Sequence, residues 1–292
     1  MFLVVMCDLA AGLGVLQGGI VSQGWNCSSS NIPVTGTVCA TDGSSVSYWQ
    51  GVTCTDNATV VGVALPGVSL SGTLPSTIGN LTSLASFNTY GNKLHGTIPS
   101  AIGHLKSLTF LDLTSNQFTG TLPSAFGFVS SLEYLAVSSN SIVGTVPSSL
   151  YKLASLTYLS LRGNSLSGSL PSELGYLSSL HTLYASHNRL SGTVPSVLGS
   201  LPSLVSVVLS HNNFDGAIPS TLGYLSYLEL LDLTYNSLTG TLPSQLCSLP
   251  KLQYLIFYDH NSINCTATTT ATCLSISFYN DIQYCISGKE QG

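Results

Sequence analysis

The chain has 292 residues, of which only 7% are charged, and its formal net charge is −5. It holds no run of Lys or Arg that could neutralise a phosphate backbone, so the composition argues against nucleic-acid binding. Eight cysteines favour an oxidising compartment.

The first 24 residues read MFLVVMCDLAAGLGVLQGGIVSQG, an apolar stretch rich in small residues. We expect a signal peptide over residues 1–24, although the stretch lacks Lys and Arg and is interrupted by Asp8. The alternatives are a truncated or wrongly assigned start and a poor membrane anchor. No other segment approaches the ~18–20 apolar residues needed to span a bilayer, so we expect no transmembrane helix.

A 24-residue unit fills most of the remaining chain. Seven full copies run from Leu81 to Ser248, each close to LxxLxxLxLxxNxLxGxLPxxLGx, and a diverged copy precedes them. We therefore assign residues 57–248 to repeats, between an N-terminal cap at 25–56 and a C-terminal cap at 249–292. Such a repeat predicts one elongated solenoid of stacked modules, which is more often a binding surface than an enzyme.

Each position of the unit has a structural interpretation. The LxL pair alternates with polar neighbours and predicts a short strand with one buried face. The Gly and Pro that follow predict an extended, irregular segment. One asparagine recurs at Asn92, Asn116, Asn140, Asn164, Asn188, Asn212 and Asn236. We predict that it points inward and bonds the backbone of neighbouring modules, because a buried amide must satisfy its hydrogen bonds. In the frayed copy after Ser248, His260 stands in place of the asparagine.

The cysteines gather at the two ends of the repeats. Three precede the repeats, at Cys27, Cys39 and Cys54, and four lie at the C-terminal end, at Cys247, Cys265, Cys273 and Cys285. We predict disulfides that hold the end modules in place. Free buried cysteines are the alternative reading, and the four C-terminal cysteines allow three connectivities.

The motif NxLSGxLPxxLGxL is similar to the plant-type leucine-rich repeat. Over residues 45–260 the chain resembles receptor-kinase ectodomains, receptor-like proteins and polygalacturonase-inhibiting proteins, and YWQGVTC resembles a segment of that family's N-terminal cap. The resemblance implies an α/β-type repeat solenoid. In this horseshoe a parallel β-sheet lines the concave face, the convex side is irregular or 3-10, and disulfides close the caps. It also implies that Cys54 bonds an upstream cysteine, with Cys39 favoured and Cys27 as the alternative.

Aromatic side chains are expected on the solvent side of the strands. The outward positions hold an aromatic strip with Arg162 at its centre and two histidines beside it. The strip is Phe110, Tyr134, Tyr158 and Tyr184, and the histidines are His187 and His211. Aromatic residues and Arg dominate binding hot spots. The alternative is that aromatic residues simply favour strands.

Little in the sequence predicts catalysis. His187 and His211 are 24 residues apart and therefore expected to be neighbours, but no third metal ligand is obvious. Asp112 and Asp232 share a column five modules apart, which is too far for paired acid–base work. We expect no enzyme, no metal and no cofactor.

Recognition outside the cell is the function that the sequence favours, with a protein, peptide or glycan bound on the concave face. The HRD and DFG kinase motifs are absent, so a receptor would need a co-receptor or kinase partner. The alternatives are an enzyme inhibitor of the polygalacturonase-inhibiting type and a structural or adhesive surface protein of a protist. Secretion is also favoured by four glycosylation sequons, at Asn26, Asn57, Asn80 and Asn264.

Overall fold

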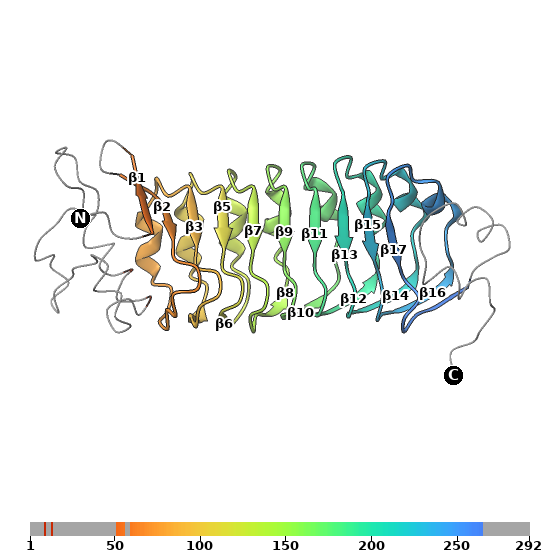
Figure 1. The fold of residues 1–292 in the computed structure, drawn as a ribbon, viewed down its shortest axis with the longest axis horizontal. Coiled ribbons are helices and arrows are strands. Elements are labelled where there is room, and N and C mark those ends of the chain that lie inside the picture. Colours follow the sequence, from red (N-terminus) through yellow and green to blue (C-terminus); the bar gives the residue numbers. More distant parts are fainter. Residues whose placement is uncertain (1–8, 10–12, 14–50, 56–58, 265–292) are drawn as a thin grey trace, which may run out of the picture. The chain divides into compact units, whose positions relative to one another are not determined.

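The computed structural model describes residues 51–55 and 59–264, together with Leu9 and Leu13. The chain divides into two compact units, residues 1–143 and residues 144–292. Most of the expected signal peptide and most of the two expected caps lie outside the described residues. Both units are built from the same module, as the ribbon shows (Figure 1).

The LxL segments form short strands that pair side by side within each unit. In residues 1–143 the strand order is β1-β2-β3-β5-β7, with β1 antiparallel to β2 and the later pairs parallel. In residues 144–292 the order is β9-β11-β13-β15-β17, and every pair is parallel. The bounds in the first unit are β1 (Val52–Cys54), β2 (Val60–Ala64), β3 (Ser86–Asn88), β5 (Phe110–Asp112) and β7 (Tyr134–Ala136). Those in the second are β9 (Tyr158–Ser160), β11 (Thr182–Tyr184), β13 (Ser206–Val208), β15 (Leu230–Asp232) and β17 (Tyr254–Ile256).

The register of these strands follows the 24-residue period, as the sequence predicts. Leu111 lies opposite Leu135, and Leu183 lies opposite Leu159. The central residues of β3, β5, β11, β15 and β17 are buried, while the residues on either side of them are at least partly exposed. We call the outer face of these strands the strand face; the sequence places it on the concave side.

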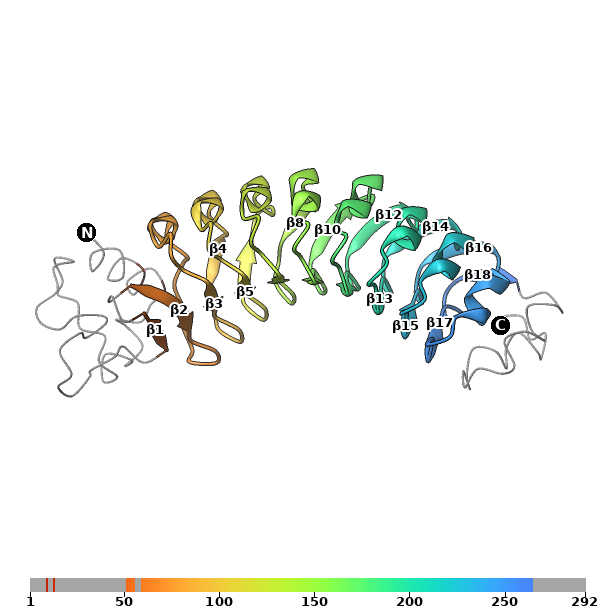
Figure 2. The same cartoon turned by 90° about the horizontal axis from the view of Figure 1, so that it is seen from above.

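A 3-10 helix follows the Pro of each full repeat. Within each unit these helices lie on the side opposite the strand face (Figure 2). Pro restricts the backbone before the helix to an extended conformation, and the following leucine closes the turn. For example, the Leu105 N–H donates to the Ile102 carbonyl at 3.1 Å. The bounds are η2 (Ser76–Asn80), η3 (Ser100–His104), η4 (Ser124–Phe128), η5 (Ser148–Lys152), η6 (Ser172–Tyr176), η7 (Ser196–Ser200), η8 (Ser220–Tyr224) and η9 (Ser244–Ser248).

A second set of parallel strands connects the strand face to the 3-10 helices. The sequence predicts only an extended segment here, whereas the structure pairs these segments into sheets. β4 (His95–Thr97) pairs with β6 (Gln117–Thr119) in the first unit. The second unit has the order β10-β12-β14-β16-β18. Their bounds are β10 (Ser165–Gly168), β12 (Arg189–Thr193), β14 (Asn213–Ala217), β16 (Ser237–Thr241) and β18 (Ser262–Asn264), and β8 (Val143–Thr145) falls at the division between the units.

The asparagine ladder predicted from the sequence is present in both units. The Asn212 side-chain oxygen accepts from the Leu190 N–H at 3.0 Å. Its amide nitrogen donates to the carbonyls of Ala185, Leu209 and Ser210 at 2.9–3.3 Å. Asn92 and Asn116 in the first unit make the same set of bonds. Each amide therefore ties its own loop to the preceding module.

The final asparagine differs from the expectation, because Asn261 rather than His260 occupies the position. The Asn261 oxygen accepts from the Leu238 N–H at 2.8 Å, and its nitrogen donates to the Leu233 and Phe257 carbonyls. One extra residue in this copy moves the asparagine by a single place. The assignment of His260 was therefore wrong, and its side chain is free for another contact.

Both described cysteines, Cys54 and Cys247, are disulfide-bonded. The other predicted disulfide cysteines, Cys39, Cys265, Cys273 and Cys285, lie outside the described residues. The pairing within the caps stays a prediction.

Tyr151 is an irregularity inside the repeat. It occupies a column that the other full repeats fill with Gly, apart from Cys247 in the last. A Cβ at Gly103, for example, would lie 2.7 Å from the Ala125 carbonyl oxygen of the next module. The Tyr151 side chain is buried, and its hydroxyl has no hydrogen-bond partner. Burial, with a smaller contribution from Glu173, raises the pKa of Tyr151 far above its ordinary value.

Tyr151→Phe is expected to leave stability unchanged or to raise it by about 1 kcal/mol, because it removes an unpaired buried hydroxyl. The pKa of Tyr151 is raised in the folded state, so the phenol stays protonated there. Below the ordinary tyrosine pKa of ~10 the phenol is protonated in the unfolded state as well, and the free energy of unfolding does not depend on pH through this group. Above that pH the unfolded state releases the proton first, and the native protein should lose up to ~1.4 kcal/mol per pH unit relative to the variant. Urea unfolding of both proteins at rising pH measures this difference. Parallel pH profiles would show that the hydroxyl is solvated.

Candidate recognition surface

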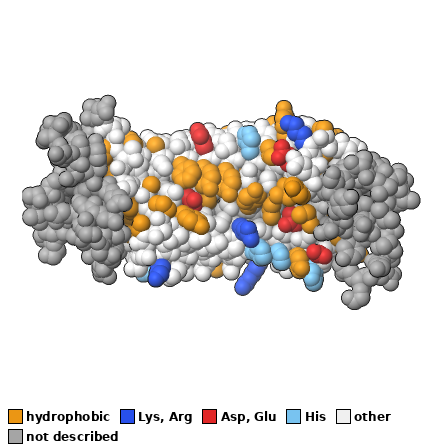
Figure 3. Space-filling model, viewed as in Figure 1, with side chains coloured by type: hydrophobic (Ala, Val, Ile, Leu, Met, Phe, Trp, Pro, Cys, Tyr) orange, Lys and Arg blue, Asp and Glu red, His pale blue; other side chains and the backbone are white. Residues whose placement is uncertain are grey.

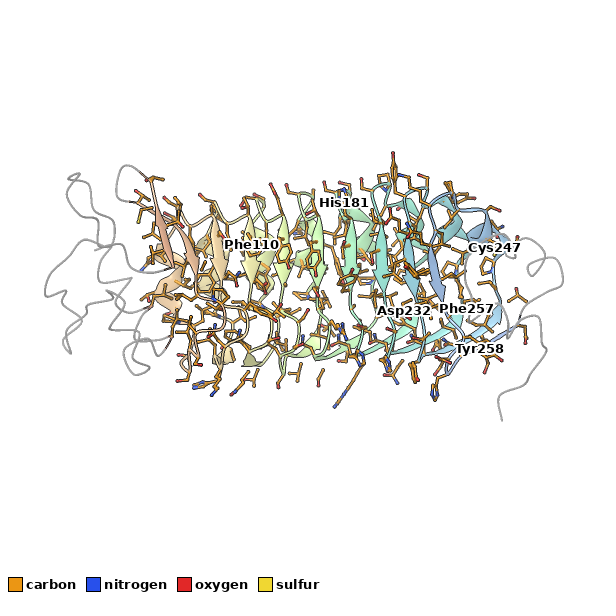
Figure 4. All side chains as sticks on the ribbon, viewed as in Figure 1. Phe110, His181, Asp232, Cys247, Phe257 and Tyr258 are labelled. Carbon is orange, nitrogen blue, oxygen red and sulfur yellow. The ribbon has the colours of Figure 1, made fainter. Side chains whose placement is uncertain are left out.

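The strand face carries aromatic side chains in each unit, at the positions that the sequence predicts. In the first unit Phe110 opens β5 and Tyr134 opens β7, and the two residues lie directly opposite each other. Their rings stack with centroids 4.3 Å apart and planes 14° from parallel. Each ring covers part of the other, so both are partly rather than fully exposed. Figure 4 shows Phe110 on this strand.

A second aromatic pair lies in the other unit. Tyr158 in β9 and Tyr184 in β11 meet edge to face, with ring centroids 5.8 Å apart. The Ser206 hydroxyl lies 3.4 Å from the Tyr184 hydroxyl and donates to it. Arg162, in the loop after β9, is exposed. This pair is therefore held by a ring contact on one side and a polar contact on the other.

The strand face around these rings is largely apolar. In the second unit Val208, Leu230 and Ile256 extend outward from β13, β15 and β17. Tyr254 beside them is 59% exposed. Figure 3 shows apolar side chains, in orange, gathered over the strands of each unit. Large exposed apolar groups in contact with one another are typical of an interaction surface.

The two acidic residues of the strand face have structural roles. The Asp112 carboxylate accepts from the Thr114 N–H at 2.9 Å. The Asp232 carboxylate accepts from both the N–H and the hydroxyl of Thr234, at 3.1 and 2.8 Å. Each side chain thus bonds its own strand end. Within the part of the chain that the structure describes, no group of three or more His, Cys, Asp and Glu side chains is placed to hold a metal ion.

The two predicted histidines are neighbours, as their spacing indicates. The rings of His187 and His211 stack with centroids 4.1 Å apart. Burial lowers the pKa of His187, and the positive charges of His211 and Arg162 lower it further, against an opposing effect of Asp232.

Two further rings that sequence reasoning missed continue this stack. Tyr235 lies 4.1 Å from His211, and His260 lies 4.3 Å from Tyr235, measured between ring centroids. All four residues directly precede the ladder asparagine of their module. Reading that column of the repeat would have found Tyr235, and His260 joins it only because of the extra residue in the last copy.

Two of the predicted glycosylation sites are described, and both are exposed. Asn80 ends η2 and Asn264 ends β18. Asn26 and Asn57 lie outside the described residues. No helix in the described part of the chain combines the length and the apolar character that a membrane crossing requires.

Comparison with known proteins identifies the family. The leucine-rich repeat model matches residues 111–166, 130–190 and 202–263. The chain belongs to the leucine-rich repeat family, and its repeat is of the plant type. No curated protein gives a significant match to the sequence.

Solved plant receptor ectodomains share the fold. The ectodomain of the receptor kinase GASSHO1/SCHENGEN3 from Arabidopsis thaliana, in complex with CASPARIAN STRIP INTEGRITY FACTOR 2, is 32% identical with a TM-score of 0.84. The match covers 94% of this chain and 32% of that one. The ectodomain of the Arabidopsis receptor kinase HAESA, bound to an IDA peptide hormone, is 31% identical with a TM-score of 0.75, covering 90% and 42%. The BIR3–SERK2 complex from Arabidopsis thaliana matches at 30% identity and a TM-score of 0.52, covering 64% and 93%. The chain thus spans about a third of the length of the first of these ectodomains.

Proposed function

We propose that this chain is a receptor-like recognition module that binds a peptide on its strand face, outside the cell. The observation that carries the proposal is the pair of ring contacts there, Phe110 with Tyr134 and Tyr158 with Tyr184. The similarity to HAESA, whose structure holds a peptide hormone ligand, supports the peptide class.

The physical argument starts from the rigidity of the rings. A ring held by a neighbouring ring loses little conformational freedom when a ligand docks, so more of the contact energy appears as affinity. Tyr and Phe also bury large apolar areas, and Tyr adds a hydroxyl that can bond a peptide backbone. Arg162, exposed after β9, supplies a cation able to bond a carboxylate or a carbonyl of the ligand.

Secretion and a partner chain complete the proposal. Exposed Asn80 and Asn264 are accessible for glycan attachment, and the disulfides of Cys54 and Cys247 fit an oxidising compartment. The sequence contains no HRD or DFG motif, so a kinase activity would come from another chain or from a further part of the same protein. The structure of HAESA with the co-receptor SERK1 is an example of a receptor that assembles with a second chain.

The test is a peptide selected for binding from a displayed random library. For a peptide that binds the second unit, Tyr184→Ala should raise the dissociation constant roughly 30-fold, or about 2 kcal/mol. For a peptide that binds the first unit, Phe110→Ala should have the same effect, and thermal midpoints should change little in both variants. Titration calorimetry measures the constants. Ser124→Ala and Ser172→Ala are matched controls, because both serines are exposed in 3-10 helices.

Two outcomes would contradict the proposal. Equal losses in the serine controls would place binding on the helical side. Inhibition of a polygalacturonase by a protein that selects no peptide would favour the inhibitor function instead.

A further inference from the structure

Four neighbouring rings form a continuous row in the second unit, which we call the ring ladder; the first three are stacked, and the fourth is tilted by 31° against the third. It consists of His187, His211, Tyr235 and His260, with successive centroids 4.1, 4.1 and 4.3 Å apart. His187 and His260 are exposed, and Tyr235 is 39% exposed. Figure 3 shows histidine side chains, in pale blue, beside Lys and Arg side chains along the lower edge of these strands.

The backbone conformation at these four positions does not favour aromatic residues. All four residues adopt the left-handed conformation, with φ between 53° and 58°. Gly163 holds the equivalent position in the first module of this unit, also with a positive φ. Gly adopts this conformation without strain, whereas a bulky residue such as Tyr235 is an outlier there. The presence of rings at positions that favour glycine indicates that the rings themselves have a function.

Charged groups surround the ladder on several elements. Arg162 from the loop after β9 and Asp232 from β15 both influence the charge of His187. Arg189 begins β12 two residues beyond His187, and Asp259 directly precedes His260. The Asp232 carboxylate is already bonded by Thr234. At His187 the effect of Arg162 on the pKa is larger than the opposing effect of Asp232.

We propose that the ring ladder binds the carboxylates of an acidic peptide segment, and that it does so when its imidazoles are protonated. This inference rests on the proposed function only in taking the ligand to be a peptide. A protonated imidazole donates from both nitrogens, and its hydrogen bonds to carboxylates are strong. Rings 4.1 Å apart lie close enough for the two oxygens of one carboxylate to bond to both.

The pH dependence follows from the stacking. Burial disfavours the charged form of His187, and repulsion from His211 and Arg162 adds to this effect, so the free protein resists protonation of His187. A bound carboxylate offsets that repulsion and stabilises the charged rings. Proton uptake and peptide binding are thus coupled, and affinity rises as the pH falls below the ordinary histidine pKa of ~6.5.

The probe is a hexaglutamate peptide, with hexaglutamine as the uncharged control. Calorimetry at about pH 5.5 and about pH 7.5 should show at least ~10-fold tighter hexaglutamate binding at the lower pH, with net proton uptake. The net charge of −5 disfavours non-specific attraction of a polyanion at neutral pH.

Three variants make the test specific. The double variant His187→Gln with His211→Gln should remove the pH dependence, and His260→Gln should reduce it. His181→Gln is the matched control, because His181 is exposed and lies directly before β11 (Figure 4). His187, in contrast, follows β11. Thermal midpoints of all variants check that they fold, and His260→Gln serves if the double variant does not.

The proposal is overturned if hexaglutamate binds equally at both pH values, if it does not bind at all, or if His181→Gln has the same effect. A failure of this kind leaves peptide recognition on the strand face intact. That function fails separately, through an unchanged affinity of the selected peptide for both Tyr184→Ala and Phe110→Ala.

Discussion

Leu159→Ala is expected to lower the free energy of unfolding by roughly 2–5 kcal/mol. Leu159 is the central residue of β9, where it is 1% exposed, and it lies opposite Leu183 of the next module. Truncation removes apolar contacts and leaves a cavity between stacked modules, which the 24-residue register prevents from closing. The cost therefore combines the lost transfer energy with the cavity.

Urea unfolding of the two proteins measures this difference, with Ser155→Ala as a control. Ser155 is exposed in the same module, so its change should stay within about 0.5 kcal/mol. An unchanged midpoint for Leu159→Ala would show that the strand face and the core are assigned the wrong way round.

Asn212→Ala is expected to cost about 3 kcal/mol, since it leaves several buried backbone groups without partners at once. The Leu190 N–H loses its acceptor, and the carbonyls of Ala185 and Leu209 lose a donor. These groups belong to two successive modules, so the loss loosens the contact between modules rather than one loop.

The neighbouring Asn213 provides a matched control, because it is exposed in β14. Asn213→Ala should have little effect on the unfolding midpoint, and hydrogen exchange should show faster opening around Leu190 only in Asn212→Ala. Equal effects of the two substitutions would contradict the structural role of the ladder.

The repeating part of the fold was predictable because the same physical constraints act on every module. A leucine at fixed period has to face the core in every module, and an inward asparagine has to bond the backbone beside it. Leu111 and Asn212 accordingly lie where the sequence places them. The pairing of the second strands, β10 to β18, was not predictable, because Ser, Gly and Thr in those segments show no alternation that distinguishes a strand from a loop.

The sequence did not predict the structure where a single residue departs from the repeat. The extra residue before Asn261 shifts the last asparagine by one place, and only the hydrogen bonds of the folded chain reveal it. The same shift brings His260 into the ring ladder. The burial of Tyr151 depends on the room beside it in the folded chain, which no pattern in the sequence specifies.

The candidate site was also predictable in part. Strand alternation places Phe110, Tyr134, Tyr158 and Tyr184 on one face of their strands, so the positions of these rings were predictable. Their mutual geometry, stacked in one pair and edge to face in the other, depends on rotamers that the sequence does not determine. The identity of the ligand was not predictable, because the ligand is a separate molecule that this sequence does not encode.

The most direct test of recognition on the strand face is the attachment site of a bound peptide. A photoreactive diazirine is placed in the peptide selected from the library, and mass spectrometry maps its cross-links. We expect attachment within the outward positions of β9, β11 and β13, or within β5 and β7 of the first unit. Cross-links concentrated in the 3-10 helices η5 to η9, with none on these strands, would contradict recognition on the strand face.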